Sequence, residues 1–520
     1  MTSIPILSPE QAATWDQRAE QAGIALATLM DAAGRAVAAA LAERFGSRLG
    51  GGVLVAAGPG NNGGDGWVTA RALHRLDVPV FVASAPGEPS PLNRRMAGLA
   101  RGEGVRTLDP DGPWPQVQVA VDALLGTGAR GVLRAPIRSL VDRLNDLSVP
   151  ILAVDGPTGI DLATGTGHGV PVRAELTVTF GGYRRGHLLA RDECGDVLVV
   201  DIGHPAGDRG WPVLLTEPEA ARLQETFGAR EHKGTRGRIV VIGGEAGMSG
   251  ALRLAARSAF AAGAGLVHAV APAGTIEALV AAEPDLQTLR HEFLAPLAPA
   301  LMALLGSADA VVIGPGLGRG PGRREFVIAT AAASAPAPLI LDADALNAFA
   351  DARDDIAGLA RGRALLLTPH AGEFRRLFPE LGDLLESDPW AAACGAAERV
   401  GAVVLLKGVP TVVAQAHGAP LTVAAGNPGL ATGGSGDVLS GLAGTFAAQL
   451  QQPGAAAAVA ALALGRAAEL AARRVSARAL RPMDVIAALP DLWRSWETLR
   501  RAPSVPRPPV LDLLEAPQRW

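Results

Sequence analysis

The chain has 520 residues, a formal net charge of −4, 48% hydrophobic residues and 19% charged residues. This composition excludes wholesale disorder, the length predicts more than one domain, and the lack of a basic excess argues against a nucleic-acid partner. The two cysteines, Cys194 and Cys394, lie far apart, which argues against a zinc site or a disulfide framework. The N-terminus lacks the pattern of a signal peptide, and the apolar stretch at 454–465 is too short to span a bilayer. We therefore expect a cytoplasmic protein with no membrane partner.

Short apolar runs alternate with helical segments in the first part of the chain. Ser8 followed by Pro9 is typical of a helix start. A glycine-rich loop at 58–66 follows the first expected strand, and a helix is expected from Trp67 to Leu76. Strands are predicted at 52–57, 78–83, 117–121, 149–154 and 176–180. Strands that alternate with helices indicate a parallel sheet covered on both faces.

The alternation breaks after 213–215 and starts again further along the chain. The second set of strands is predicted at 238–242, 265–270, 310–313, 339–341, 364–367 and 402–406. Helices follow to about Trp496, and the proline-rich end is expected to be loose. The sequence therefore predicts two α/β domains, at 1–215 and 223–497, and a loose tail at 498–520.

Polar residues follow three of the strands expected in the first domain. The segment GPGNNGGDG at 58–66 follows one strand, Asp122 ends a second and Asp155 ends a third. Ligands of open α/β sheets bind beyond the carboxyl ends of the strands, and a helix N-terminus after a glycine-rich turn attracts phosphate. A plain turn and two helix caps are the alternative interpretation, but the glycine-rich loops after each strand favour a ligand site.

These segments, GPGNNGGDG, VDALLGTG and VDGPTGID, resemble the YjeF-type N-terminal domain, an NAD(P)HX epimerase with a Rossmann-like fold. The resemblance implies a potassium ion held by Asn62, Asp122 and Thr158. The group that moves protons is not identified by it, and we take Asp155 as the candidate catalytic residue. It implies a hydrated dinucleotide bound by Asn61, Asn62, Gly63, Gly64, Asp65, Gly126, Thr127, Gly128, Ala129, Arg130, Gly131, Val132 and Asp155. The sequence departs from the family at Thr158, where serine is usual, and at 182–186, where a Pro-Lys pair is common.

The strongest motif of the second domain is GNPGLATGGSGD at 426–437, followed by an apolar helix. Backbone N–H groups at such a helix start form an anion hole, and Asp437 is placed to accept a hydroxyl proton. A helix-capping aspartate is the alternative. The chain has only two lysines, Lys233 and Lys407, and both lie in glycine-flanked loops. Because lysine and arginine differ as phosphate ligands, these positions are candidates for a requirement for lysine.

With LLKGVPT, HKGTRGRIVVIGG, GPGLG and TPHAGEF, this motif resembles the ribokinase-like ADP/ATP-dependent NAD(P)HX dehydratase. The resemblance implies a pocket for hydrated nicotinamide lined by Ala251, Gly316, His370 and Asp437, with Asp437 catalytic. It implies an adenine-nucleotide site, for ADP with magnesium, formed by Lys407, Gly408, Val409, Pro410, Thr411 and Gly436.

Together the two resemblances imply a repair enzyme for NADHX and NADPHX, the hydrated forms of NADH and NADPH. The first domain would interconvert the R and S epimers. The second would dehydrate the S epimer at the expense of ADP, giving AMP and phosphate, and a homo-oligomer is expected. Two alternatives stay open. One is a vitamin or sugar kinase fused to a dinucleotide-binding domain, and the other is a non-catalytic first domain that serves as a scaffold.

Overall fold

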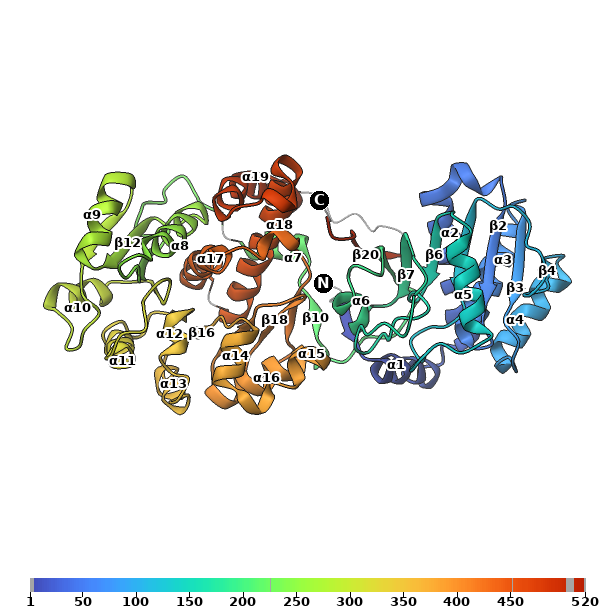
Figure 1. Ribbon diagram of the computed structural model, residues 1–520, viewed down its shortest axis with the longest axis horizontal. Helices are drawn as coiled ribbons and strands as arrows, with labels where there is room; N and C mark the ends of the chain where they lie inside the picture. The colour runs from blue at the N-terminus through green and yellow to red at the C-terminus, as the bar shows by residue number, and fades with distance from the viewer. Residues whose placement is uncertain (1–3, 225, 451, 502–508, 519–520) are drawn as a thin grey trace. The chain divides into compact units, whose positions relative to one another are not determined.

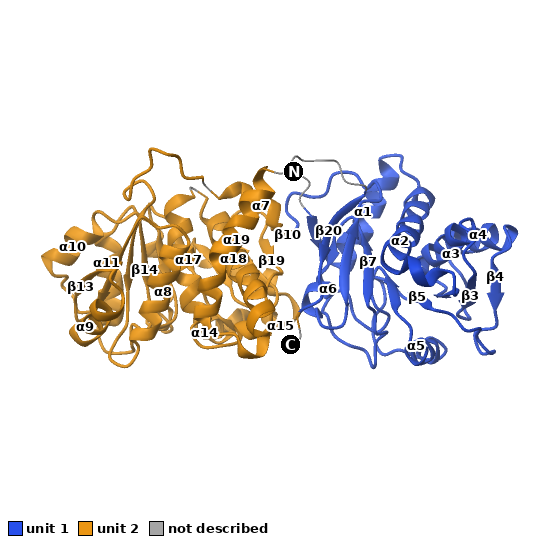
Figure 2. Cartoon of the chain, turned by 90° about the horizontal axis from the view of Figure 1, so that it is seen from above, with its two compact units in different colours: residues 1–211, 505–517 blue, residues 212–504, 518–520 orange. Residues whose placement is uncertain are grey.

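A computed structural model describes residues 4–224, 226–450, 452–501 and 509–518, and the chain divides into two units (Figures 1 and 2). Unit 1 comprises Met1–Trp211 with Val505–Pro517, and unit 2 comprises Pro212–Ser504 with Gln518–Trp520. Each unit has its own parallel sheet and its own buried apolar clusters. The α/β class and the two-domain arrangement predicted from the sequence are confirmed.

The sheet of unit 1 has strands that the apolar runs predict, and it is parallel except at one edge. In spatial order the strands are β20 (Val510–Leu514), β9 (Asp196–Val200), β7 (Leu176–Phe180), β6 (Ile151–Val154), β5 (Val119–Ala123), β2 (Val53–Ala57), β3 (Val80–Ser84) and β4 (Arg106–Leu108). Only β20 runs antiparallel to its neighbour. A separate short parallel pair joins β1 (Ile4–Leu7) to β8 (Tyr183–Arg184).

Helices cover both faces of this sheet, as continuous apolar strands require. Along β2, Val53 and Val55 pack with α2 (Leu26–Leu49), α3 (Asn61–His74) and α4 (Pro91–Gly102), whereas Leu54 packs with α5 (Ile137–Asp146). The first helix, α1 (Pro9–Gln21), begins with the predicted cap, because Ser8 and Gln11 form a capping box. A short helix α6 (Arg185–Leu189) follows β8.

The sheet of unit 2 is parallel along most of its width, with two antiparallel pairs near one end. Its order is β13 (Gln287–Arg290), β12 (Leu266–Ala271), β11 (Arg238–Ile242), β14 (Ala310–Ile313), β15 (Leu339–Leu341), β16 (Leu365–Leu367), β17 (Val403–Leu406), β18 (Thr411–Ala414), β19 (Leu421–Val423) and β10 (Val213–Leu214). The antiparallel pairs are β17 with β18 and β18 with β19. The six strands predicted for this half of the chain are all present within one residue at each end.

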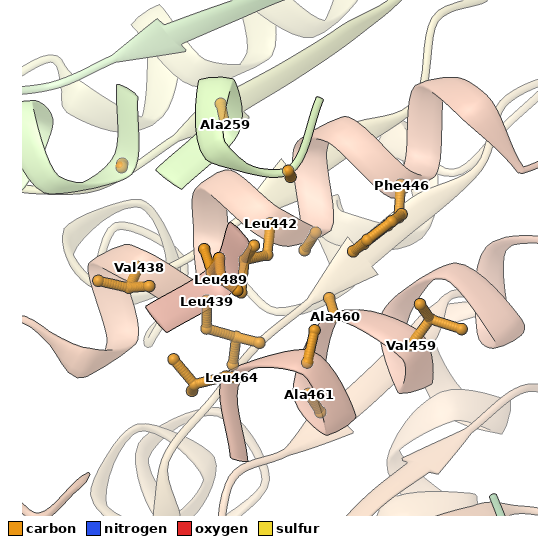
Figure 3. Packing of buried hydrophobic residues seen from close by; sticks show 14 of the residues in the cluster. Ala259, Val438, Leu439, Leu442, Phe446, Val459, Ala460, Ala461, Leu464 and Leu489 are labelled. Atoms are coloured by element: carbon orange, nitrogen blue, oxygen red, sulfur yellow. The ribbon is translucent and has the colours of Figure 1, made fainter. Parts of the chain in front are cut away.

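Two helices, α17 (Ser435–Gln449) and α18 (Pro453–Val475), form the centre of the largest apolar cluster of unit 2. Figure 3 shows Leu439 of α17 close to Ala461 and Leu464 of α18. Helix α18 is long and apolar enough to cross a membrane by length and composition, but 72% of its most apolar window is buried inside the protein. The buried helix predicted at 454–465 is therefore confirmed as a core helix. Further helices that the site uses are α8 (Ser249–Ala261), α12 (Asp344–Asn347), α14 (Ala371–Leu377) and α19 (Pro482–Arg501).

The predicted domain limits need two corrections. Residues 212–215 belong to unit 2, because β10 pairs in parallel with β19, and the following helix α7 (Glu217–Leu223) packs against α19. The end of the chain is not a loose tail throughout, since 510–514 form β20 on the edge of the unit 1 sheet. Prolines precede this strand, and their pattern led us to expect a loose tail in spite of the apolar residues that follow. Residues 502–508 lie outside the described part of the chain.

The helix predicted to begin at Trp67 begins at Asn61 instead, so most of the glycine-rich segment is helical. Close packing explains why glycine is needed there. A Cβ atom on Gly63 would lie 1.9 Å from the Gly58 carbonyl oxygen, and one on Gly66 would lie 2.6 Å from the Cβ of Ala123. Glycine lowers helix propensity, which is why the sequence pattern favoured a loop.

Candidate active sites

A cavity of about 500 Å³ lies beyond the carboxyl ends of the unit 1 strands. It brings together side chains from three strand ends that are distant in sequence. Eight of the predicted dinucleotide residues line it, namely Asn61, Asn62, Asp65, Gly126, Thr127, Gly128, Ala129 and Asp155. A cavity of this size, at this position in an α/β sheet, is where a small ligand is expected to bind.

The start of α3 is held in place beside this cavity by two polar side chains. Asn93 Nδ2 donates to the carbonyl oxygens of Gly58 and Gly60 at 2.8 and 2.7 Å, and Ser90 Oγ donates to Asn61 Oδ1 at 2.7 Å. Gly63 and Gly64 face these neighbours and the Met30 side chain instead of lining the cavity. Their role is to let the helix approach the adjacent chain closely.

Asp155 is the most constrained carboxylate of unit 1. It follows β6 with a positive φ of 63°, a conformation that few residues other than glycine adopt. Its Oδ2 accepts from the Thr127 backbone N–H at 2.9 Å and from the Thr127 hydroxyl, and its Oδ1 lies 3.1 Å from the Arg184 guanidinium. Burial raises the pKa of Asp155, but Arg184 and Thr127 outweigh burial and leave the pKa below its usual value. Asp155 is therefore an ionised acceptor at neutral pH.

A second carboxylate, Asp65, lines the same cavity and behaves in the opposite way. Burial, together with the negative charges of Asp155 and Asp16, raises the pKa of Asp65 well above its usual value. Two carboxylates with pKa values pushed apart provide one proton donor and one proton acceptor in one site. The resemblance to the epimerase family implied that Asp65 binds the dinucleotide, and it did not imply a role in proton transfer.

Asp122, Thr158 and Asn62 lie together, as the predicted potassium site requires. Thr158 donates to Asp122 from its backbone N–H at 2.7 Å and from its hydroxyl at 2.8 Å, and both residues are fully buried. Burial raises the pKa of Asp122 to about 6, with the hydrogen bonds from Thr158 and Leu124 opposing it. Asn62 is also buried, and its Nδ2 has no partner among the described residues.

These residues fit a monovalent cation. Asp122 offers a buried negative charge, and Asn62 and Thr158 offer neutral side-chain oxygens, which are the hard ligands that such ions prefer. Among the described residues, no group of three or more His, Cys, Asp or Glu side chains is placed to hold a metal ion. The oxygen-rich donor set is therefore suited to potassium rather than to a transition metal.

The remaining predicted dinucleotide residues of unit 1 lie apart from the main cavity. Arg130, Gly131 and Val132 line a second cavity of about 430 Å³, which shares Leu125 and Ala129 with the first. Arg130 also forms an ion pair with Glu10. The loop at 125–132 therefore separates two cavities instead of lining one.

In unit 2, Lys407 forms an ion pair with a carboxylate that sequence reasoning missed. Its Nζ lies 2.6 Å from Asp342 Oδ1, and Ser440 of α17 donates its hydroxyl to Asp342 Oδ2 at 2.5 Å. Asp342 is buried, yet Lys407 and the hydroxyl keep its pKa below the usual value. Lys407 is thus not a solvated lysine at the end of a strand but part of a buried charge network.

Asp437 lies in the first turn of α17, close to this network. Burial raises its pKa to about 7, the negative charge of Asp342 adds to the rise and the positive charge of Lys407 opposes it. No backbone N–H of the helix start is capped by the Asp437 side chain, since the N-cap position is Gly434 with φ of 98° and no side-chain hydrogen bond. A carboxylate with a pKa near neutrality is suited to accept a proton from a substrate hydroxyl.

The other predicted unit 2 residues group around the same helix start. A Cβ atom on Gly436 would lie 3.3 Å from Lys407 Nζ, so the nucleotide motif and the lysine are adjacent. The backbone N–H of Lys407 donates to the Pro369 carbonyl at 2.9 Å, which places His370 beside the turn that joins β17 and β18. This turn contains Gly408, Val409 and Pro410, and Thr411 begins β18; Gly408 and Val409 are exposed.

Gly316 and Ala251 are in contact. A Cβ on Gly316 would lie 3.3 Å from the Cβ of Ala251 and 2.8 Å from that of Met248. Helix α8, which carries Ala251, packs against α17. His370 has a structural role that its motif did not indicate, because its Nδ1 accepts from the backbone N–H groups of Gly372 and Glu373 and caps α14.

Three residues of the two sites were missed, namely Arg184, Asp342 and Ser440. Arg184 stands in the segment 182–186 that departs from the family's Pro-Lys pattern, so the departure itself was the available signal. Asp342 follows the strand LIL directly, in the same position relative to its strand as Asp155, and Asp122 lies near the end of its own strand. A search for aspartates at strand ends would have found it, whereas Ser440, in mid-helix, gave no signal.

The fold and the two sites define a two-domain α/β enzyme with a dinucleotide-sized cavity in one unit and a nucleotide-type helix start in the other. The protein-family model described as YjeF-related protein N-terminus matches residues 26–186 of the sequence. The family model described as NAD(P)H-hydrate dehydratase matches residues 239–491. A bifunctional NAD(P)H-hydrate repair enzyme of Salinibacter ruber is 38% identical over 91% of this chain and 92% of its own length. One from Escherichia coli is 36% identical over 84% of each chain.

The chain belongs to the family of bifunctional NAD(P)H-hydrate repair enzymes, which joins an epimerase domain to a dehydratase domain. Among solved structures, an ADP/ATP-dependent NAD(P)H-hydrate dehydratase from Bacillus subtilis is 27% identical, with a TM-score of 0.47, and covers 54% of this chain and 97% of its own.

Proposed function

We propose that unit 1 interconverts the R and S epimers of hydrated NADH and NADPH, and that unit 2 dehydrates the S epimer with ADP. The chain belongs to this family, and each of its two units has a predicted site aspartate with a raised pKa, Asp65 in unit 1 and Asp437 in unit 2. Each of these aspartates lies near a second aspartate that is paired with a cation. This observation carries the proposal. Each site therefore has the proton donor or acceptor that its reaction needs.

In unit 2 the reaction starts at the C6 hydroxyl of the hydrated ring. Asp437 accepts the hydroxyl proton while the oxygen attacks the terminal phosphorus of ADP, and AMP leaves. The ring nitrogen then expels phosphate from C6, C5 loses a proton, and the dihydropyridine is restored. Phosphate is a far better leaving group than hydroxide, which is why ADP is consumed.

The N–H groups at the start of α17 are suited to stabilise the transferring phosphoryl group, and Lys407 lies beside them at Gly436. Magnesium with the nucleotide belongs to the proposal, and it would supply positive charge to the phosphates. Lys407–Thr411 and Gly436 would hold the nucleotide. Ala251, Gly316 and His370 would hold the nicotinamide end of the substrate.

In unit 1 the C6–O bond must break and form again on the other face of the ring. Asp65, in its protonated form, donates a proton to the departing hydroxyl, and ionised Asp155 accepts a proton from the returning water. Exchange with solvent then returns a proton to Asp65 and removes the one on Asp155. Arg184 and Thr127 fix the Asp155 carboxylate in the cavity. Potassium, held by Asn62, Asp122 and Thr158, would supply the charge that balances Asp122 and order the adjoining loops.

The deciding assay supplies hydrated NADH, as a mixture of epimers, to the full chain with ADP or with ATP. Complete recovery of NADH absorbance requires both activities, because one epimer alone accounts for only part of the mixture. No recovery with either nucleotide contradicts the proposal. A product that keeps a stable phosphate ester would instead support a small-molecule kinase. A homo-oligomeric state and a cytoplasmic location stay predictions from the sequence.

A further inference from the structure

Unit 2 has a cavity of about 460 Å³ that none of the roles proposed above uses. Its wall comes from the loop that follows Gly316, from the start of α11 (Arg323–Ala333), from α12 with the residues after it, and from α14. Four arginines and three carboxylates line it, namely Arg319, Arg323, Arg324, Arg376, Glu325, Asp344 and Asp351. So many guanidinium groups around one cavity raise the question of which of them are available to a ligand.

Two of the four arginines are already engaged. Arg323 pairs with Glu245, donates to the carbonyl oxygens of Leu317 and Phe293 at 3.2 and 3.1 Å, and lies over the Phe293 ring. Arg324 lies 3.3 Å from Asp351, which is an exposed surface carboxylate. These two arginines build the wall of the cavity and its outer edge.

The other two, Arg319 and Arg376, keep donors available. Arg376 donates from Nε to Asn347 Oδ1 at 3.1 Å, and within the described residues no carboxylate pairs with it. Arg319 has only a long contact, 3.4 Å from Nε to Asp344 Oδ1, and its side chain is 74% exposed. Asn347 Nδ2 also contacts Asp344 Oδ1 at 3.3 Å, so one short helix positions both guanidinium groups.

The position of this cavity associates it with the dinucleotide and not with ADP. Gly316 and His370, the residues predicted to bind the nicotinamide, lie shortly before two segments that line the cavity. These segments are 318–324, which follows Gly316, and the end of 370–376, which follows His370. The nucleotide residues 407–411 and Gly436 do not line it. Asp344 lines the cavity, and its negative charge contributes to the raised pKa of Asp437, so the two carboxylates lie within electrostatic reach of each other.

We propose that this cavity binds phosphate groups of the hydrated dinucleotide, with Arg319 and Arg376 as the ligands. The inference rests on the function proposed for unit 2. A dinucleotide carries a pyrophosphate, and NADPHX carries an additional 2′-phosphate. Guanidinium groups bind such oxygens in pairs of charge-assisted hydrogen bonds, and Asn347 and Asp344 hold the two forks ready to do so.

The test measures dehydration kinetics of the full chain with S-NADHX and S-NADPHX. Arg376→Ala and Arg319→Ala are expected to raise KM for the dinucleotide about tenfold, as the loss of one charge-assisted contact predicts, while kcat and KM for ADP stay unchanged. Equal effects on both substrates indicate the pyrophosphate, and an effect on S-NADPHX alone indicates the 2′-phosphate. Unchanged KM values for both dinucleotides, or a rise confined to KM for ADP, overturn the proposal.

Two controls keep this outcome separate from misfolding. Arg361→Ala removes an exposed arginine that does not line the cavity, and it is expected to change nothing. Unchanged kcat and KM for ADP report that unit 2 is intact, because both depend on the unit that carries the substitutions. Arg376→Lys keeps the positive charge but loses the paired N–H donors of the guanidinium group. A KM for the dinucleotide between those of the wild type and the alanine variant therefore supports bidentate binding.

A binding measurement separates this inference from the proposed function. Calorimetric titration of the full chain with inorganic pyrophosphate is expected to lose one site, or about tenfold in affinity at that site, in the double variant of Arg319 and Arg376. If the wild type does not dehydrate NADHX, the proposed function fails, and this titration still tests the cavity. Identical titrations of the wild type and the double variant overturn the anion site itself.

Discussion

The two units solve the same electrostatic problem with different residues. In each, one aspartate is paired with a cation and keeps a low pKa, and a second aspartate nearby has a raised pKa. In unit 1 the pair is Asp155 with Arg184, and in unit 2 it is Asp342 with Lys407. The difference is where the paired carboxylate stands. Asp155 lines its cavity, whereas Asp342 is buried beneath Lys407 and Ser440.

This difference has a consequence for catalysis. In unit 1 both carboxylates can reach a substrate, so the site has an acid and a base together. In unit 2 Asp437 is placed to reach the substrate hydroxyl, and the buried Asp342 acts through its charge. An epimerisation that removes and returns the same group needs both partners, whereas a phosphoryl transfer needs one proton acceptor.

The largest effect is expected for Asp437→Asn, which removes the only proton acceptor placed at the start of α17. Dehydration of S-NADHX should fall by about 10²-fold or more, the range for a lost general base. Epimerisation should stay unchanged, because it belongs to unit 1. The measurement is the initial rate of NADH formation from pure S epimer. Near-normal dehydration in this variant would show that Asp437 has only a structural role at the helix start.

The next effect concerns Asp122→Ala, which removes the only charged member of the proposed potassium site. We expect epimerisation to fall about tenfold and to lose any response to added potassium, while dehydration of the pure S epimer continues. Asp122→Asn is the matched control, since it keeps the shape and part of the hydrogen bonding to Thr158. An alanine variant that still responds to potassium would place the ion elsewhere.

The pH dependence separates the two units without a mutation. Because the pKa of Asp437 is about 7 and only its ionised form accepts a proton, dehydration should rise with pH through 7 and level off above it. The pKa of Asp155 is lowered, so its ionisation does not limit epimerisation in that range, and Asp122, with a pKa of about 6, limits it only at the acidic end. Rates measured from pH 5.5 to 8.5 (about three units around neutrality) with each pure epimer test this. Coincident rising limbs would contradict the assignment.

Sequence patterns predicted the strands and the motif aspartates well. They failed where tertiary packing determines the secondary structure. Apolar runs identify buried strands because both faces of a parallel sheet are covered. The glycines at 63 and 66 read as a loop, but they allow close packing of a helix that the neighbouring strands impose. The strand at 510–514 forms through an edge pairing with β9, far away in sequence, and no local pattern contains that information.

The ion pairs were also beyond the sequence. Asp342 and Lys407 are separated by 65 residues. Asp155 follows β6, and Arg184 lies on β8, which comes directly after the neighbouring strand β7. Composition did point to Lys407 as one of two lysines in the chain, but it did not reveal what the lysine contacts. Its partner and the surrounding space follow from the fold alone.

The smallest effect is expected for Lys407→Arg. The guanidinium can keep the ion pair with Asp342, so the fold should tolerate it. However, the space around Nζ is narrow, since a Cβ on Gly436 would lie only 3.3 Å away. A broad planar head should displace the Gly436 turn and weaken nucleotide binding, and we expect KM for ADP to rise about fivefold with little change in epimerisation.

The matched control is Lys233→Arg, the same substitution at the other lysine, which is exposed. It should leave KM for ADP as in the wild type. The comparison therefore asks whether lysine is required by local geometry at one position and merely tolerated at the other. Equal KM values for ADP in the wild type and both variants would show that Lys407 serves only as a positive charge for Asp342. The site of unit 2 would then resemble that of unit 1, where arginine already fills this role beside Asp155.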